Sequence, residues 1–340
     1  MSLLDRKLRV AVLMGGASSE RPVSLATGKM ILQALDPMKY AIRGVDTADL
    51  LTLAQAPAPR IGQRGEAASE EIVPTASADT FAGRPDVVFI ALHGKGGEDG
   101  TVQGMLEFLD IPYTGSGVLA SALAMNKAMT KRLLAAEGLP VIEDVRIDRD
   151  GSRPEADWME EVGSRLGYPV FVKPNAEGST FGCALVNTPT ELPQAVAKAL
   201  EYDSLALIER YVRGIEITAG VLEAADGKPE ALPLVEIVPK SAYYDYESKY
   251  AAGGSDHYIP ARLPEALSRQ AQELALRCHA LLGCRGMSRT DMLVENERLA
   301  ILEVNTIPGM TPTSLLPQAA EQAGIPFAVL LDRLIAAALR

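Results

Sequence analysis

The sequence predicts an α/β fold in its first third and an α+β arrangement in its C-terminal half. Two continuous apolar runs in the first third, residues 8–14 and 87–92, are each followed by a glycine-rich loop and a segment with helical periodicity. Such runs are typical of strands buried on both faces of a parallel sheet. After residue 138, shorter strand-like runs alternate with single helices. Three modules fit this pattern better than two.

The individual elements follow from apolar periodicity and from the positions of glycine and proline. Residues 54–83 are rich in alanine, proline and glycine and are predicted to be a surface excursion between elements. A single helix is predicted over residues 118–138, where Gly138 ends it. The other predicted strands are residues 170–173, 205–209, 217–222, 292–294 and 300–304, and the other predicted helices are residues 24–35, 100–109, 191–201, 264–282 and 326–339.

Composition excludes several classes of protein. The net charge of −11 over 340 residues lacks the broad positive field of a nucleic-acid-binding protein. No apolar stretch is long enough to span a bilayer, so no membrane association is expected. Three cysteines in so long a chain argue against a disulfide framework and favour a reducing cytoplasm. Cys278 and Cys284 lack zinc-site spacing, and His279 is expected to face solvent on a helix.

The clearest chemical signal is a set of oxygen-bearing side chains in the last third of the chain. Asp291 lies in one predicted strand, and Glu303 and Asn305 lie in the next, after a short polar turn. Glu303 and Asn305 are two residues apart, so on a strand they point to the same face. Oxygen ligands without histidine or cysteine suit Mg²⁺. An exposed polar strand face is the alternative, but both acids lie within apolar runs, where an unpaired charge is costly.

A metal held by few protein ligands suggests a nucleotide, and Lys173 is placed to serve one. Lys173 ends a predicted strand before the glycine-containing loop 177–182, whose backbone N–H groups could cradle phosphates. The loop lacks the Gly-Lys-Ser/Thr ending of a Walker loop. A solvated surface lysine is an equal alternative. Glu209 and Glu216 could bind a ribose or an adenine amino group, and structural ion pairs would explain them equally well.

Three glycine-rich loops directly follow predicted buried strands, at residues 15–21, 92–100 and 305–315. The carboxyl ends of strands are the usual place for ligand sites in open α/β sheets. A lone histidine such as His93 is more often structural than catalytic, but its position in one of these loops favours a functional role.

Together these segments resemble the D-alanine–D-alanine ligase family of the ATP-grasp superfamily. The resemblance runs from Val10 to the C-terminal helix, and only residues 54–83 lie outside recognisable motifs. Agreement at so many separated sites is not explained by chance. The motifs are Gly15-Gly-x-Ser-Ser-Glu20-Arg-x-Val23-Ser24-Leu, Leu92-His93-Gly-x-Gly-Gly-Glu-Asp-Gly, Tyr113-Thr-Gly-Ser-Gly, Tyr244-Asp-Tyr-Glu-x-Lys249-Tyr250 and Glu303-Val-Asn305-Thr-x-Pro-Gly-Met-Thr.

The resemblance implies an ATP-grasp fold preceded by an N-terminal parallel-sheet domain. The implied domains are residues 1–125, which would hold the first D-alanine, residues 126–216, and residues 217–340, with a mobile lid at residues 240–258. ATP would lie between the sheets of the second and third domains. The family also implies a homodimer.

The resemblance assigns contacts to ATP and to metal by position in the motifs. Lys127 and Lys173 would contact the α- and β-phosphates, and Lys249 of the lid would reach the γ-phosphate. Glu209 would bind the adenine amino group and Glu216 the ribose. The backbone of Tyr211 and Val212 would contact ATP. Asp291, Glu303 and Asn305 would bind two Mg²⁺ ions, which Mn²⁺ could replace, and Glu303 would bridge them.

The substrate contacts are implied in the same way. Glu20 would hold the ammonium group of the first D-alanine, His93 would lie near its carboxylate, and Val23 would complete that site. Ser314 and Leu315 would hold the second D-alanine.

The implied reaction joins two D-alanine molecules and converts ATP to ADP and phosphate, which supplies a dipeptide for peptidoglycan. The first D-alanine carboxylate would attack the γ-phosphate to form an acyl phosphate, and the second amine would displace phosphate. Arg289 and the backbone N–H of Gly309 would stabilise the oxyanion. The residues resembling the hydrogen-bonded trio that locks the lid are Glu20, Ser179 and Tyr250.

Three other functions are weighed against this one. A ligase joining D-alanine to D-lactate or D-serine is the nearest, and Tyr250 favours D-alanine because D-lactate-specific relatives tend to replace it. A nucleotide-binding regulatory protein would have lost a metal ligand, a phosphate lysine or Arg289, and all are present. A carboxylase-type enzyme would usually need biotin or bicarbonate, which the loops around Glu20 and His93 do not suggest. Thr290 departs from the apolar residue usual in the family, which concerns packing rather than chemistry.

Overall fold

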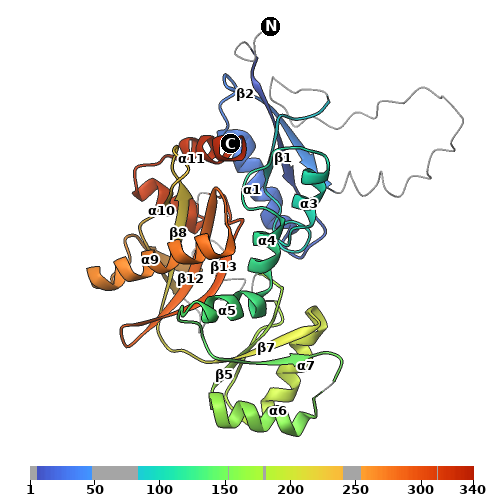
Figure 1. The fold of residues 1–340 in the computed structure, drawn as a ribbon, viewed down its shortest axis with the longest axis vertical. Coiled ribbons are helices and arrows are strands. Elements are labelled where there is room, and N and C mark those ends of the chain that lie inside the picture. Colours follow the sequence, from blue (N-terminus) through green and yellow to red (C-terminus); the bar gives the residue numbers. More distant parts are fainter. Residues whose placement is uncertain (1–5, 48–82, 152, 179–180, 240–253, 312) are drawn as a thin grey trace, which may run out of the picture.

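Three sheets follow one another along the long axis of the molecule (Figure 1). This computed structural model describes residues 6–47, 83–151, 153–178, 181–239, 254–311 and 313–340. The predicted surface excursion, except for Gly83, therefore lies outside the described residues, as do Ser179, Lys249, Tyr250 and residues 240–253 of the predicted lid. In Figure 1 the N-terminal sheet lies at the top, the C-terminal sheet in the middle and the central sheet at the bottom.

The N-terminal sheet is parallel and buried on both faces, as its continuous apolar strands predicted. Its strand order is β2-β1-β3. Val10 and Val12 of β1 face helix α1, whereas Ala11 and Leu13 face helix α3. The carboxyl ends of β1 and β3, with the loops that follow them, meet at one edge of the sheet. The elements are β1 (Leu8–Met14), α1 (Arg21–Ala34), β2 (Tyr40–Asp46), β3 (Val87–Ile90) and α3 (Thr101–Phe108).

The central sheet is antiparallel and has a core of its own. Its order is β4-β7-β5-β6, with helices α6 and α7 on the side away from the rest of the molecule (Figure 1). Trp158 and Leu192 of these helices are buried against its strands. The elements are β4 (Asp144–Asp148), α6 (Glu155–Glu161), a π-helical turn (Val162–Leu166), β5 (Val170–Pro174), β6 (Ala184–Val186), a 3₁₀ turn (Pro189–Glu191), α7 (Leu192–Tyr202) and β7 (Leu205–Arg210).

The C-terminal sheet is antiparallel, with the order β11-β10-β8-β12-β13 and β9 paired to β8. Alternate residues of β8 serve different helices: Ile217 packs with α9, and Leu222 packs with α10 and α11. The elements are β8 (Ile215–Glu223), β9 (Pro229–Ala231), β10 (Val235–Pro239), β11 (Ser255–Tyr258), α9 (Glu265–Leu282), β12 (Met287–Glu295), β13 (Arg298–Asn305), α10 (Leu315–Gln322) and α11 (Phe327–Ala338).

One hydrophobic core joins the N-terminal and C-terminal sheets. Helix α11 packs against both α1 and β3, and side chains from both sheets form a single buried cluster. The Tyr40 hydroxyl also donates to Oδ1 of Asp332 in α11 at 2.7 Å. Arg285 before β12 donates to the carbonyls of Tyr113 and Gly115 at 3.1 and 3.0 Å. These contacts make the two sheets one packed unit.

Two expectations about the helices are wrong, and the end of the predicted loop 240–258 is strand β11, which pairs with β10. The single helix over residues 118–138 is two helices, α4 (Val118–Met125) and α5 (Lys127–Ala136). Asn126 has an extended backbone between them, and its side chain caps α5 by accepting from the N–H of Met129 at 3.0 Å. His279 does not face solvent but is 3% exposed, and it shares a 2.8 Å hydrogen bond with the Ser288 hydroxyl. This reversal arises because α9 lies flat on the sheet.

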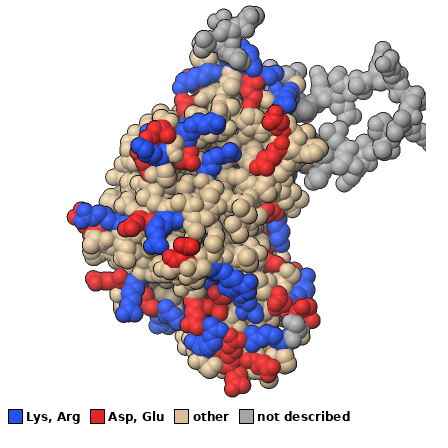
Figure 2. Space-filling model, viewed as in Figure 1, with Lys and Arg blue, Asp and Glu red and all other residues tan. Residues whose placement is uncertain are grey.

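Acidic and basic side chains are interspersed on the face seen in Figure 2, without a continuous basic patch. Within the described ranges, no helix is both long and apolar enough to cross a membrane.

Candidate active site

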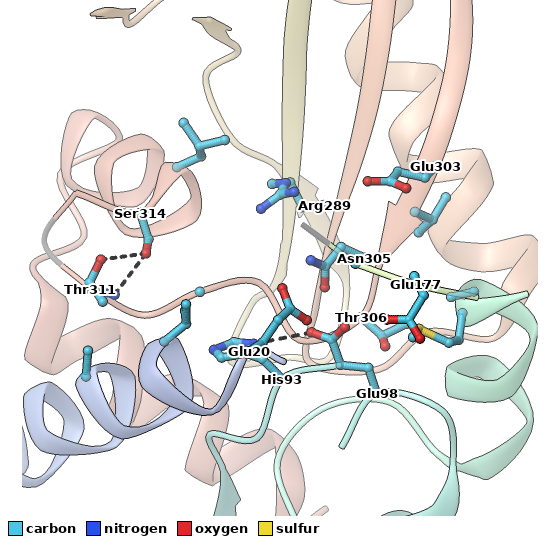
Figure 3. Close-up of a pocket in the computed structure, with 18 of the residues that line it drawn as sticks. Glu20, His93, Glu98, Glu177, Arg289, Glu303, Asn305, Thr306, Thr311 and Ser314 are labelled. Carbon is cyan, nitrogen blue, oxygen red and sulfur yellow. Dashed lines mark hydrogen bonds and ion pairs between the residues drawn. The ribbon is translucent and has the colours of Figure 1, made fainter. Parts of the chain in front are cut away.

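Two pockets adjoin where the three sheets come together. One pocket, of about 440 Å³, lies among the loops that follow β1, β3 and β13 and is called the loop pocket (Figure 3). The other, of about 520 Å³, lies between the central and C-terminal sheets and is called the sheet cleft. Both are lined by Lys127, Glu177, Gly178 and Glu303. A molecule in the sheet cleft could therefore meet another in the loop pocket at this junction.

The predicted oxygen ligands lie on paired strands. Strands β12 and β13 place Asp291 opposite Glu303, as the short turn between them predicted. Asn305 follows two residues later in β13, so strand alternation directs its amide to the same face as the Glu303 carboxylate; both are labelled in Figure 3. All three offer oxygen atoms, so the donor set fits a hard divalent cation such as Mg²⁺.

Cationic side chains neutralise these acids. Arg289 donates to both oxygens of Asp291, at 2.9 and 2.7 Å, and the Thr218 hydroxyl donates to Oδ1 at 2.5 Å. The ammonium of Lys127 lies 3.2 Å from Oε2 of Glu303. Pairing of this kind lets charged groups remain in a site that is largely removed from water.

A second charged cluster forms the opposite wall of the sheet cleft. Lys173 is the next-to-last residue of β5, and its Nζ lies 2.8 Å from Oε2 of Glu209 on β7. Burial lowers the pKa of Lys173, but the nearby charges of Glu209 and Glu303 outweigh it and leave the pKa above its ordinary value. Burial likewise raises the pKa of Glu209, but lysine charges outweigh it and leave that pKa below its ordinary value. Both groups are therefore charged at neutral pH.

The loop after β3 holds His93 at the N-terminal side of the loop pocket. Its Nδ1 lies 3.2 Å from Oε1 of Glu98 and its Nε2 lies 3.1 Å from the Thr27 hydroxyl, which together fix the ring. Glu20, 5% exposed, lies beside it (Figure 3). A Cβ on Gly178 would lie 2.7 Å from Oε2 of Glu20, so a larger residue in the loop after β5 would displace the Glu20 carboxylate.

The loop after β13 forms the far wall of the loop pocket. The Ser314 hydroxyl accepts from the backbone N–H of Thr311 at 3.0 Å and shares a 2.8 Å hydrogen bond with the Thr311 hydroxyl (Figure 3). A Cβ on Gly309 would lie 2.9 Å from Oγ of Ser314, so glycine keeps this turn tight. The turn therefore lines the pocket with Gly309 and with a hydroxyl, that of Ser314, which is held in place.

Every predicted site residue that the structure describes lines at least one of the two pockets. Those in the loop pocket alone are Glu20, Val23, His93, Arg289, Asn305, Gly309, Ser314 and Leu315. Those in the sheet cleft alone are Lys173, Glu209, Tyr211, Val212, Glu216 and Asp291, and those in both are Lys127 and Glu303.

Sequence reasoning missed four residues that support these side chains: Glu98, Lys131, Glu177 and Thr218. Glu98 and Glu177 stand inside motifs that were noticed for their glycines. Lys131 lies one helical turn after Lys127, a spacing that places both on one face and could have drawn notice. Thr218 had no signal in the sequence, because its pairing with Asp291 depends on the strand register.

Comparisons with known proteins decide the family. A family model described as "D-ala D-ala ligase N-terminus" matches residues 9–116, and one described as "D-ala D-ala ligase C-terminus" matches residues 133–336. The chain belongs to the D-alanine–D-alanine ligase family.

Individual relatives agree over nearly the whole chain. A D-alanine–D-alanine ligase of Syntrophobacter fumaroxidans is 48% identical over 335 residues, covering 98% of each chain. One of Pelotomaculum thermopropionicum is 44% identical, covering 98% of this chain and 97% of its own. Among solved structures, the Bacillus anthracis ligase complexed with ATP has 33% identity and a TM-score of 0.77, with 98% of each chain covered. The Coxiella burnetii ligase has 32% identity and a TM-score of 0.79, with 98% and 94% covered. The fold is accordingly ATP-grasp, and the chain is an ATP-dependent D-alanine–D-alanine ligase by family.

Proposed function

We propose that the two pockets carry out the two halves of one ligation, ATP in the sheet cleft and two D-alanine molecules in the loop pocket. The observation that carries this proposal is the junction, where Lys127 and Glu303 line both pockets. A phosphoryl group held there can be reached from either side. ATP use is also supported by the ATP complex of the Bacillus anthracis relative.

We propose that the lysines and acids of the sheet cleft hold the nucleotide. Lys127 and Lys173 neutralise phosphate charge, and the Glu209 carboxylate accepts a hydrogen bond from the adenine amine. Glu216 binds the ribose, and the backbone of the segment Tyr211–Val212 contacts the base. The support is the position of these residues along one cleft, with Lys173 and Glu209 charged and fixed in place.

Metal binding is assigned to Asp291, Glu303 and Asn305, with two Mg²⁺ ions proposed and Mn²⁺ as a substitute. When bound, the metal supplies charge neutralisation at the phosphates. The protein's own part is to present three oxygen-bearing side chains from two hydrogen-bonded strands. Thr218 orients one of them, since it donates to Asp291.

The chemistry proceeds by two displacements. A carboxylate oxygen of the first D-alanine attacks the γ-phosphorus, and ADP leaves, giving D-alanyl phosphate. The amine of the second D-alanine, after losing a proton, attacks the acyl carbon; phosphate leaves with the electron pair of the broken C–O bond. Glu20 and His93 orient the first D-alanine beside Val23, and Ser314 and Leu315 orient the second.

Arg289 and the backbone N–H of Gly309 stabilise the oxyanion of the tetrahedral intermediate. Both line the loop pocket. The remaining part of the proposal is a lid at residues 240–258, in which Lys249 contacts the γ-phosphate and Ser179 and Tyr250 lock the lid to Glu20. Of these residues, the structure describes only Glu20 and residues 254–258.

The three sheets support a division into residues 1–125, 126–216 and 217–340. We place the reaction in the cytoplasm, where ATP is available, and its product in peptidoglycan synthesis.

A homodimer is supported by large apolar side chains exposed on and beside α3 and α4, with Phe108 91% and Leu119 71% exposed. Phe108→Glu should shift a dimer to monomer in sedimentation, with Met38→Glu as the control; an unchanged mass would refute this interface.

Phosphate release from ATP tests the function directly. D-alanine, D-lactate and D-serine are supplied separately and in pairs, and the products are identified by mass. D-alanine alone should support release and yield the dipeptide. Release that needs D-lactate or D-serine as a partner would assign the related ligation, and the absence of D-alanine-dependent release would refute both.

Substitution of Glu303 tests the metal assignment. Glu303→Ala should lower turnover about 1,000-fold or more, because it removes a proposed ligand of the metal that would neutralise the reacting phosphates. Glu273→Ala, an exposed acid on α9, is the matched control. Activity of Glu303→Ala within a few-fold of the control would contradict a role at the metal.

A further inference from the structure

Lys131 and Lys127 lie one turn apart on α5 but have different surroundings. Lys127 lines both pockets, whereas Lys131 is 2% exposed and lines neither. Lys131 therefore does not touch a ligand in the sheet cleft, and any effect on ligand must pass through another side chain.

The side chain of Lys131 lies between two acids that face each other. Strands β4 and β7 pair Asp144 directly opposite Glu209. Two like charges at such a position repel each other. The ammonium of Lys131 lies 3.0 Å from Oδ1 of Asp144 and 2.7 Å from Oε1 of Glu209, so it bridges the pair.

Both oxygens of Glu209 are thereby held. Lys131 contacts Oε1, and Lys173 contacts Oε2 at 2.8 Å. The carboxylate cannot turn without losing one of these contacts, and the edge that remains lines the sheet cleft. Burial works against the charge of Glu209, but the two lysines hold its pKa below the ordinary value.

Stability alone does not account for this arrangement. Buried ion pairs stabilise a fold no better than well-packed apolar side chains of similar size. Asp144 has a second partner in Arg146, whose Nε lies 2.6 Å away, so Asp144 does not need Lys131 in order to be paired. The contact that Lys131 adds to this network is therefore the one to Oε1 of Glu209.

We propose that Lys131 is a positioning residue for the nucleotide, one that fixes Glu209 as an oriented acceptor for the exocyclic amine of the base. The proposal rests on the proposed function of the sheet cleft. The expected effect is selective. Lys131 should strengthen the hydrogen bond between Glu209 and the base amine, and it should not affect the binding of D-alanine.

The test pairs a substitution with a change in the ligand. The variant Lys131→Met is compared with the control Arg132→Met, which removes an exposed basic side chain from the same helix. The affinity of each is measured for Mg-ADP and for the diphosphate of purine riboside, a base that lacks the exocyclic amine. The wild type and Arg132→Met should prefer ADP about tenfold or more, the worth of a hydrogen bond to a charged group. For Lys131→Met the preference should fall to about twofold. The KM for D-alanine should not change.

A second variant covers the case in which Lys131→Met does not fold. The double substitution Lys131→Met with Asp144→Asn removes one charge of each sign and leaves Lys173 paired with Glu209. It should fold and show the same loss of preference for ADP. An undiminished preference in either folded variant overturns the proposal. If the wild type binds no ADP, or binds it without D-alanine-dependent turnover, the proposed function fails instead.

Discussion

The central sheet and the other two sheets are held in different ways. The N-terminal and C-terminal sheets share one hydrophobic core, sealed by α11 and by the Tyr40–Asp332 hydrogen bond. The central sheet has a separate core, and polar contacts join it to the rest. Lys95 in the loop after β3 pairs with Glu177 and donates to the Tyr202 carbonyl at 3.0 Å, and Arg210 lies 3.2 Å from Glu295.

The difference matters because the sheet cleft has one wall on each region. Domains joined by small polar interfaces move relative to each other by default, whereas a shared apolar core resists such motion. The candidate metal ligands and the loop pocket thus lie mainly on the rigid unit, and Lys173 and Glu209 lie on the part that can move. We expect the central sheet to open and close the cleft as one body.

The largest expected effects come from truncating each core. Leu334→Ala in α11 and Leu192→Ala in α7 each remove a fully buried side chain, so each should cost about 2–5 kcal/mol in the free energy of unfolding. Hydrogen exchange should show lost protection in both the N-terminal and C-terminal sheets for Leu334→Ala, but only within residues 144–210 for Leu192→Ala. If Leu192→Ala lowered hydrogen-exchange protection in all three sheets, the central sheet would not have a core of its own.

The thiols should report the two regions separately. Burial raises the pKa of Cys278 to about 12 and that of Cys284 to about 11, so at pH 8 about one in a thousand or fewer of these groups is the reactive thiolate. Cys183 is half-buried and lines the sheet cleft. Iodoacetamide at pH 8, followed by peptide mass analysis, should label Cys183 first, and Mg-ATP should slow that labelling. Equal labelling of all three thiols would argue against this view.

Removing one hydroxyl should weaken the joint between the N-terminal and C-terminal sheets. Tyr40→Phe loses the bond to Asp332 and should cost about 1 kcal/mol in urea unfolding, with Tyr202→Phe as a control on the central sheet. Burial and this bond raise the pKa of Tyr40 above its ordinary 10.0. Its contribution should therefore be full below pH 10 and decline as the pH rises further. A constant difference through pH 11 would contradict the assignment.

The smallest effect on stability is expected at the polar contact. Lys95 is half exposed, so Lys95→Ala should change the free energy of unfolding by less than about 0.5 kcal/mol. The looser central sheet should nevertheless raise the KM for ATP and increase the radius of gyration in X-ray scattering. If the stability falls while both of these stay unchanged, Lys95 does not restrain the central sheet.

The pairing of the candidate metal ligands Asp291 and Glu303 could be predicted from the sequence because its geometry is local. Strand alternation and a short turn are enough to bring Asp291 beside Glu303. The loop pocket is different, because Glu20, His93 and Ser314 come from three distant loops, and only the family motifs indicated that they meet. The spacing of residues within a motif does not predict contacts between loops that lie far apart in the sequence.

Other features were missed because packing overrides local preference. Asn126 stands in a run rich in helix-forming residues, yet its capping of α5 ends α4. His279 was expected in solvent because the face of α9 that meets the sheet cannot be read from one polar residue. Lys131 was passed over since its partners lie on β4 and β7, and β4 itself was not predicted.

The shared core also has a consequence for biosynthesis. Strand β3 (Val87–Ile90) and helix α1 (Arg21–Ala34) complete their burial only against α11, which does not begin until Phe327. While the ribosome makes the intervening residues, one apolar face of the N-terminal sheet has no partner. The central sheet needs no such partner and can fold as soon as its own residues emerge. The middle of this chain is therefore able to finish folding before its beginning.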